Sequence, residues 1–306
     1  MTHWAELMDY MARALQLASR ALGSVSPNPA VGAVLVRDGE IVGEGATQPP
    51  GAAHAEIVAL RAAGPRARHS TLYVTLEPCA HFGRTPPCAD AIVAAGVAEA
   101  HVAMLDPSPW VNGNGVAALE KAGIRVSRGS HEQTAERLNE AYLCWLQRRR
   151  PLVTAIYALG LDGAPRPLDE ALGAAASAEL MRLRATADRT VTAVDGLLAE
   201  DPSLTGLATG GTTSLHVEAP PRDLGALADR GLLDRVCMFL VPDLDVLVPE
   251  LGATPASDAS SVALTGRAAH ASTLHTVTYE RLGDTLLVTG YLPGSGPVHQ
   301  KPREAD

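Results

Sequence analysis

H-A-E at residues 54–56 and T-L-E-P-C-A-H-F-G-R-T-P-P-C at residues 75–88 are the two motifs around which the fold of this chain is built. Histidine and cysteine are common zinc ligands, and a catalytic zinc site takes three protein ligands and leaves a fourth position open for water. The two motifs therefore predict a zinc site. Its candidate ligands are His54, Cys79 and Cys88.

Glu56 lies two residues after His54 and is the candidate proton carrier, because a zinc deaminase needs a carboxylate that is not a ligand. If a helix begins at about Ala53, both side chains lie in its first turn and can face one cavity. Cys88 is expected to begin a second helix, residues 88–95, whose N-terminus would stabilise a thiolate. The predicted reaction is hydrolytic deamination, in which activated water attacks a ring carbon bearing an amine and ammonia leaves.

A structural zinc site is the alternative interpretation. Structural sites close the tetrahedron with a fourth cysteine or histidine, and His81 could fill that place. The glutamate discriminates between the two, since a structural site has no need of a carboxylate beside the metal. The pattern favours catalysis.

The composition excludes several classes of protein. The chain has 306 residues, 46% of them hydrophobic, which suffices for two domains with separate cores. A net charge of −9 and 4% aromatic residues argue against a nucleic-acid partner. We expect no membrane span and no signal peptide, and hence a cytoplasmic location. Cys144 and Cys237 are expected to be buried apolar residues, and Arg148–Arg150 to mark a solvated helix end.

Helical and strand patterns alternate along the first half, which predicts an α/β fold with a sheet covered on both faces. The expected helices are residues 2–22, 53–63, 88–95, 115–122 and 133–147. The expected strands are residues 30–36, 40–45, 71–75, 99–104 and 124–128.

Residues 1–150 resemble the deaminase domain of the bifunctional riboflavin-biosynthesis deaminase/reductase family. The family pattern S-P-N-P-x-V-G, H-A-E and T-L-E-P-C-x-H-x-G-[RK]-T-P-P-C is met at residues 26–32, 54–56 and 75–88. The resemblance implies a cytidine-deaminase-like α/β/α fold of three layers, with zinc on the three candidate ligands and Glu56 as the proton shuttle. It also implies a small-molecule substrate, a diaminopyrimidinone ribosyl 5-phosphate.

The resemblance also implies residues that bind the substrate. Asn28, held between two prolines, is either a turn former or a substrate hydrogen-bonder on local chemistry, and the resemblance favours contact with the pyrimidine. His81 and Arg84 would lie at the ribose-phosphate end. Two departures are Thr47, where the family has histidine, and Ser108, where it has asparagine; both lie in loops expected to line the pocket. The zinc chemistry is unaffected, whereas the exact substrate is left open.

Residues 151–306 resemble the family's reductase domain less closely, and we expect a shortened, dihydrofolate-reductase-like α/β domain. Pro151-Leu152-Val153-Thr154 and A-E-D-P-S-L-T at residues 199–205 match the family. Its lysine is replaced by Ile156, its G-x-G-T loop by residues 193–196, and its V-E-G-G turn by Val217-Glu218-Ala219-Pro220. A dinucleotide pyrophosphate needs free amides and close backbone approach, and proline has no N–H.

Chain length gives a second reason to expect no NADPH. Only residues 206–214 separate the 199–205 motif from the next expected strand, fewer than the dozen or so that a parallel crossover takes. The domain would then serve to form a homodimer or higher homo-oligomer, or to shape the deaminase entrance.

Three alternatives stay open from the sequence. The first is a deaminase of a related pyrimidine in specialised, azapteridine-type metabolism. The second is a bifunctional deaminase and NADPH reductase. The third is a catalytically silent scaffold in which zinc only holds the fold.

Overall fold

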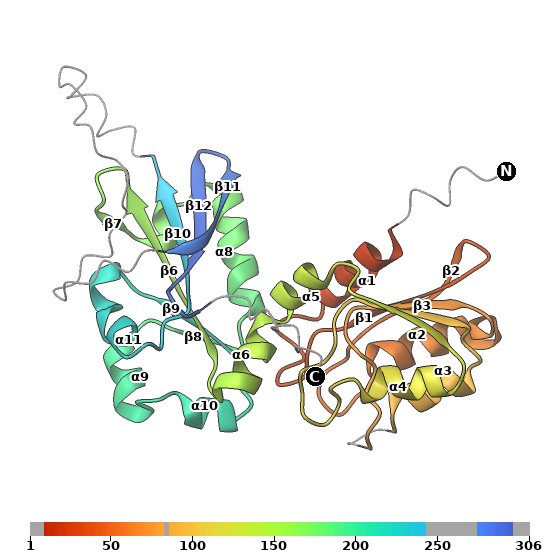
Figure 1. Ribbon diagram of the computed structural model, residues 1–306. Helices are drawn as coiled ribbons and strands as arrows, with labels where there is room; N and C mark the ends of the chain where they lie inside the picture. Colours follow the sequence, from red (N-terminus) through yellow and green to blue (C-terminus); the bar gives the residue numbers. More distant parts are fainter. Residues whose placement is uncertain (1–8, 83–85, 243–273, 296–306) are drawn as a thin grey trace. The chain divides into compact units, whose positions relative to one another are not determined.

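The computed structural model describes residues 9–82, 86–242 and 274–295. The chain divides into two compact units, Met1–Gln147 and Arg148–Asp306, each with its own sheet (Figure 1). Among the described helices, none combines the length and the apolar character that crossing a bilayer would require.

The first unit is built on a five-stranded sheet in the order β2-β1-β3-β4-β5. β1 is antiparallel to β2 and β3, whereas β3, β4 and β5 are parallel. Asp38 and Gly39 form the turn between β1 and β2 with φ angles of 53° and 79°, as an Asp-Gly hairpin requires. The strands are β1 Gly32–Arg37, β2 Glu40–Ala46, β3 Thr71–Val74, β4 Glu99–Val102 and β5 Arg125–Arg128.

Helices cover both faces of this sheet and give three layers (Figure 1). α1 packs on β1, β2 and β3, and α2 packs on β1 and β2 with α3 and α4 in the same layer. β1 is almost wholly buried because both its faces are covered. The helices are α1 Tyr10–Ser19, α2 Ala55–Ala63, α3 Cys88–Ala94, α4 Asn114–Lys121, α5 Glu132–Leu138 and α6 Glu140–Arg148; a 3₁₀ turn, η2, covers Gly64–Ala67.

Three helices differ from their expected bounds by more than one residue. Of the helix expected over residues 2–22, residues 2–8 lie outside the described part, and α1 ends at Ser19. α2 begins at Ala55, because His54 has an extended backbone with φ −72° and ψ 161°. The helix expected over residues 133–147 is two helices: Asn139 lies between them, and its side chain binds the backbone N–H and C=O of Ala30 at 2.9 and 3.1 Å.

The second unit has a seven-stranded sheet, in which β11-β12-β10-β6-β9-β8 are neighbours and β7 pairs with β6. The strands are β6 Leu152–Gly160, β7 Pro165–Arg166, β8 Arg189–Val191, β9 Ser214–Glu218, β10 Arg235–Val241, β11 His275–Leu282 and β12 Thr285–Tyr291. The helices are α7 Leu168–Ala171, α8 Ala174–Thr186, α9 Val194–Glu200, α10 Thr205–Thr209 and α11 Gly225–Asp229, with a 3₁₀ turn, η3, at Pro221–Asp223.

β6 is buried along its whole length, and its side chains alternate between two cores. Val153, Ala155 and Tyr157 pack in one core with residues of α9 and α11. Ile156 and Ala158 pack in the other with residues of α8. The opening strand expected from the sequence is therefore the central strand of this unit.

The expectation of a missing crossover is wrong. Residues 199–205 do not lead directly into a parallel strand, because the strand that precedes β9 and pairs with it is β8. The connection is residues 192–213 and contains α9 and α10, which is long enough for a parallel crossover. The expectation that NADPH is not bound now depends on the replaced glycines alone.

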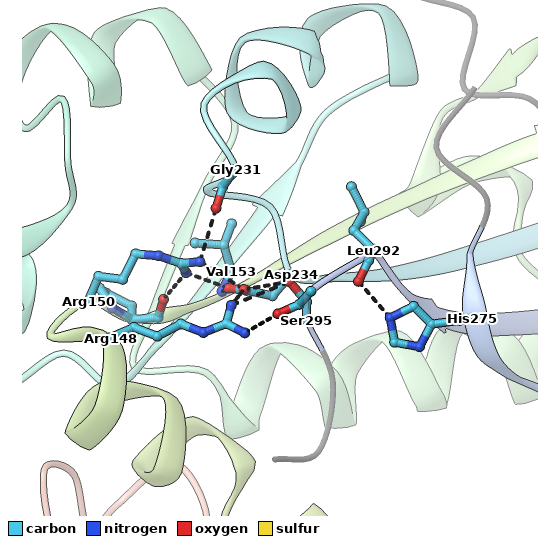
Figure 2. A network of polar contacts seen from close by, with 10 residues as sticks. Arg148, Arg150, Val153, Gly231, Asp234, His275, Leu292 and Ser295 are labelled. Atoms are coloured by element: carbon cyan, nitrogen blue, oxygen red, sulfur yellow. Dashed lines mark hydrogen bonds and ion pairs between the residues drawn. The ribbon is translucent and has the colours of Figure 1, made fainter. Parts of the chain in front are cut away.

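Asp234 is the centre of a buried ionic cluster in the second unit (Figure 2). Its carboxylate accepts hydrogen bonds from Arg148, Arg150, Ser295 and the N–H of Val153. The expectation of a solvated end at Arg148–Arg150 is therefore wrong for these two arginines, because a buried carboxylate holds both. Cys144 and Cys237 are buried, as expected.

Candidate metal centre

The side chains of His54, Cys79 and Cys88 meet in one cluster. Their ligand atoms all lie within 4.8 Å of one another. His54 Nδ1 is 3.3 Å from Cys88 Sγ and 3.7 Å from Cys79 Sγ. The histidine therefore presents Nδ1, and not Nε2, to the two sulfurs.

These distances fit a zinc ion. Zinc binds histidine nitrogen and cysteine sulfur in tetrahedral geometry with bonds that place the two donor atoms about 3.6 Å apart. The two N···S distances of 3.3 and 3.7 Å lie on either side of that value. One neutral imidazole and two thiolates balance the charge of the ion, so the donor set suits zinc in chemistry as well as in spacing.

His54 is placed by the packing of α2 on the sheet. It is the N-cap residue of α2, and its side chain makes no capping hydrogen bond, which leaves the ring free to bind metal. α2 lies directly against β2 at Gly45, where an added Cβ would be 2.3 Å from the carbonyl oxygen of Ala55. A glycine at this position therefore brings the start of α2 against the sheet.

Cys79 and Cys88 come from the loop after β3 and from the first position of α3. The N–H of Cys88 donates to Cys79 Sγ at 3.3 Å, and the N–H of Ala89 donates to the carbonyl of Cys79 at 3.1 Å. The first amides of α3 thus hold the ligand loop, residues 75–79, and provide partial positive charge beside a thiolate.

The protein alone already prepares one thiolate. The pKa of Cys79 is lowered, first by the hydrogen bond from the Cys88 thiol and then by His54. The pKa of Cys88 is raised, because its thiol donates to Cys79 and is buried. The pKa of His54 is raised mainly by its hydrogen bond with Cys79. A metal ion that binds here has to displace the proton of Cys88.

Glu56 lies beside this cluster without belonging to it. Its side chain is buried, with 4% of its surface exposed, in the first turn of α2. Burial raises the pKa of Glu56 to about 7, and a hydrogen bond from its own backbone N–H opposes that rise. A carboxyl group with such a pKa can both accept and donate a proton near neutral pH.

The residues expected to bind substrate are spread over three loops. Asn28 is half-buried in the loop before β1, and its N–H donates to Val25 at 2.8 Å. Thr47 is buried just after β2, and its hydroxyl bonds the backbone of Val31. Ser108 is buried in the loop after β4, where its N–H donates to Asp106 at 2.9 Å.

The two residues expected at the phosphate end follow Cys79 in sequence. His81 is exposed, and among the described residues it does not join the cluster of three ligands. Arg84 lies outside the described residues.

Glu77 is a site residue that sequence reasoning missed. Its buried carboxylate accepts four backbone hydrogen bonds from the loop after β4 and from the start of α4. A signal for it was present: Gly113, before α4, has no side chain to cap that helix, so the first amides of the helix need an acceptor from elsewhere.

Comparison with known proteins matches this chain to a deaminase family and to riboflavin biosynthesis proteins. Residues 5–104 match the family described as the cytidine and deoxycytidylate deaminase zinc-binding region. The chain is 46% identical over 200 residues to the riboflavin biosynthesis protein RibD of Escherichia coli. The matched region covers 64% of this chain and 54% of that protein. RibD of Aquifex aeolicus is 44% identical over 201 residues, with 64% and 56% covered. The chain thus spans about half the length of these curated relatives.

Solved structures extend the likeness to both units. RibD of Acinetobacter baumannii matches with a TM-score of 0.74 and 28% identity, covering 92% of this chain and 98% of that one. A deaminase/reductase from Thermotoga maritima shares the fold with a TM-score of 0.70 at 24% identity, covering 92% and 97%. The cytidine-deaminase-like fold and the two-domain α/β architecture are thus confirmed.

Proposed function

Over 64% of its length this chain is homologous to the riboflavin deaminase/reductase family, and we propose that it is a zinc-dependent deaminase of a pyrimidine in riboflavin biosynthesis. The substrate would be 2,5-diamino-6-ribosylamino-4-pyrimidinone 5-phosphate or a close relative. The observation that carries this proposal is the cluster of His54, Cys79 and Cys88 with the buried Glu56 beside it.

The number of ligands favours catalysis over a structural role. Among the described residues, three side chains form the cluster, and His81 does not complete it. Three protein ligands leave a coordination position for water, and the chemistry that zinc supplies in such a site is the activation of that water near neutral pH.

Glu56 would move the protons of the reaction. Its carboxylate would accept a proton from water and deliver it to the ring nitrogen as the hydroxide adds to the carbon. It would then take the proton of the added hydroxyl group and deliver it to the amine, which leaves as ammonia while the carbonyl forms. In the metal-free protein burial raises the pKa of Glu56 to about 7, and a bound zinc ion would favour the carboxylate form that accepts the first proton. Burial keeps this carboxyl from exchanging protons freely with solvent.

Asn28 is proposed to hold the pyrimidine, and His81 and Arg84 to bind the ribose phosphate. The exposure of His81, directly after the ligand loop, supports a role at the open end of the site. Thr47 and Ser108 are both buried, so they would affect the shape of the pocket through the loops in which they lie.

Ammonia release from the phosphorylated diaminopyrimidine should exceed that from its dephosphorylated form and from cytosine or guanine derivatives.

Glu56→Ala tests the function. We expect the rate of ammonia release to fall by a factor on the order of 10²–10⁴, since general acid–base catalysis is lost. Zinc content, measured by atomic absorption, should stay at the wild-type level because Glu56 is not a ligand. Glu44→Gln is the control, because it removes a carboxylate of β2 that forms an ion pair with Arg13 at 2.7 Å and is not part of the metal cluster. Undiminished turnover in Glu56→Ala would refute the proposed mechanism.

The second unit is proposed to lack a nicotinamide site. At the carboxyl end of β9 the chain continues as Ala219-Pro220, and Pro220 offers no N–H to a phosphate. Glu218 at this strand end pairs with Arg184 through two contacts of 2.7 Å, and Arg184 also pairs with Asp169. The arginine is thereby neutralised within the unit.

Titration with NADPH tests this second proposal. We expect no change in NADPH fluorescence at micromolar concentrations of protein and cofactor, because Pro220 and Pro221 after β9 have no N–H to offer a phosphate. Saturable micromolar binding would contradict the proposal and restore a bifunctional enzyme. Assembly into a homodimer or higher homo-oligomer stays a prediction. The molar mass measured by light scattering tests it.

A further inference from the structure

Glu77 makes an unusual set of contacts one residue from the ligand loop. Only 4% of its surface is exposed, and both carboxylate oxygens accept two backbone hydrogen bonds. Oε1 accepts from Gly115 at 2.9 Å and from Val116 at 3.1 Å. Oε2 accepts from Gly113 at 2.9 Å and from Asp106 at 3.3 Å. Four amides thus converge on one side chain.

Three of these amides belong to the start of α4. Gly113 is the N-cap residue of α4, with φ 91°, and it has no side chain that could accept them. The carboxylate of Glu77 therefore takes the place of a capping residue, and its negative charge lies where the helix dipole is positive. The contact joins two segments that are 36 or more residues apart in sequence.

Backbone packing reinforces the same contact. An added Cβ at Gly115 would lie 1.9 Å from the carbonyl oxygen of Pro78, so α4 touches the ligand loop directly before Cys79. The N–H of Glu77 also donates to the carbonyl of Met104 at 3.0 Å. Residues 77–79 are therefore held from both sides by the loop after β4 and by α4.

We propose that Glu77 is a positioning residue for the metal centre, because it fixes the backbone of residues 77–79 on α4 and so sets the place of Cys79 Sγ relative to His54 and Cys88. The proposal rests on the proposed function in one respect, the binding of zinc at this cluster. It adds a residue that touches neither metal nor substrate.

The same carboxylate connects the metal centre to the substrate side. Asp106, whose N–H binds Glu77, accepts hydrogen bonds from the N–H of Ser108 at 2.9 Å and from Tyr142 at 3.0 Å. A change at Glu77 should therefore disturb both the ligand loop and the loop that holds Ser108. We expect zinc affinity and KM to change together.

Two variants test the role of Glu77. Glu77→Gln keeps the shape but turns an N–H₂ toward backbone donors. Gly115→Ala keeps the carboxylate but pushes α4, with its amides, away from Pro78 and from the Glu77 side chain, whose Cγ would lie 3.1 Å from the added Cβ. Zinc affinity is measured by competition with a chromophoric chelator, and ligand geometry by the absorption bands of the protein loaded with Co²⁺. Both variants should bind zinc about 10–100-fold more weakly, as for other residues that orient metal ligands, with shifted Co²⁺ bands.

The control is Glu44→Gln, which removes a carboxylate from the same unit and should bind zinc like the wild type. Wild-type zinc affinity and an unchanged Co²⁺ spectrum in Glu77→Gln, with only a lower melting temperature, would show a merely structural role and overturn the proposal. The same result in Gly115→Ala would overturn it if Glu77→Gln did not fold. A wild-type protein that binds no zinc would refute the proposed function itself.

Discussion

His216 on β9 is a buried histidine, and one of its ring nitrogens is unpaired among the described residues. Only 2% of its surface is exposed, and its Nδ1 has no hydrogen-bond partner within the described part of the chain. Burial lowers the pKa of His216 to about 4. The folded protein therefore keeps this imidazole neutral, whereas the unfolded chain protonates it near its ordinary pKa of about 6.5.

The second unit should consequently lose stability in mild acid. Between about pH 6.5 and pH 4 the unfolded chain binds a proton that the folded chain lacks, so the free energy of unfolding falls as the pH falls. The loss is fully developed below about pH 4 and amounts to at most roughly 3 kcal/mol. Urea unfolding followed by circular dichroism across this range measures it.

His216→Leu removes both the titrating imidazole and its unpaired nitrogen. We expect its stability to depend less on pH between 4 and 6.5 than that of the wild type. If the free energy of unfolding of His216→Leu fell between pH 6.5 and pH 4 as much as that of the wild type, other groups would cause the loss of stability.

Among the elements, α2 matters most for the metal centre, because it carries Glu56 and begins directly after His54. Gly45→Ala would place a methyl group 2.3 Å from the carbonyl oxygen of Ala55 and force the helix away from β2. We expect a loss of stability of about 1–3 kcal/mol, typical of overpacking, and weaker zinc binding. Calorimetry and chelator competition measure the two effects.

Gly196→Ala in α9 is the matched control, since an added Cβ there meets nothing within 4 Å. It should be neutral or slightly stabilising, because alanine favours a helix more than glycine does. Equal losses in the two variants would contradict the close packing of α2.

The sequence predicted the elements of the first unit well, because hydrophobic periodicity and turn residues are local signals. The cluster of His54, Cys79 and Cys88 was predictable for a different reason: these residue types have few other uses at that spacing. The break at Asn139 and the contacts of Glu77 were not predictable, since both depend on backbone groups far away in sequence. The ion pairs of Arg148 and Arg150 were missed because Asp234 lies more than 80 residues away.

For the whole molecule, zinc should stabilise the two units unequally. All three candidate ligands lie in the first unit, so a chelator should lower the melting temperature of that unit and leave the second unchanged. Binding at a hundredfold excess over Kd contributes about 2.7 kcal/mol. Differential scanning calorimetry with and without chelator measures this, and a shift of both transitions would show that the units unfold together.

Acid should weaken this zinc effect. Binding requires Cys88, whose pKa is raised, to lose its proton, so zinc affinity should decrease as the pH is lowered. Proton release on zinc addition, measured in weakly buffered solution, checks the sign.

The cluster around Asp234 restricts how the chain can be shortened. Its partners come from residues 148–153 and from Ser295, so a fragment that starts after Arg150 or stops before Ser295 loses a partner of a fully enclosed charge. A protein engineer who wants the second unit by itself should therefore keep both flanks, with the first cut before Arg148 and the last cut beyond Ser295.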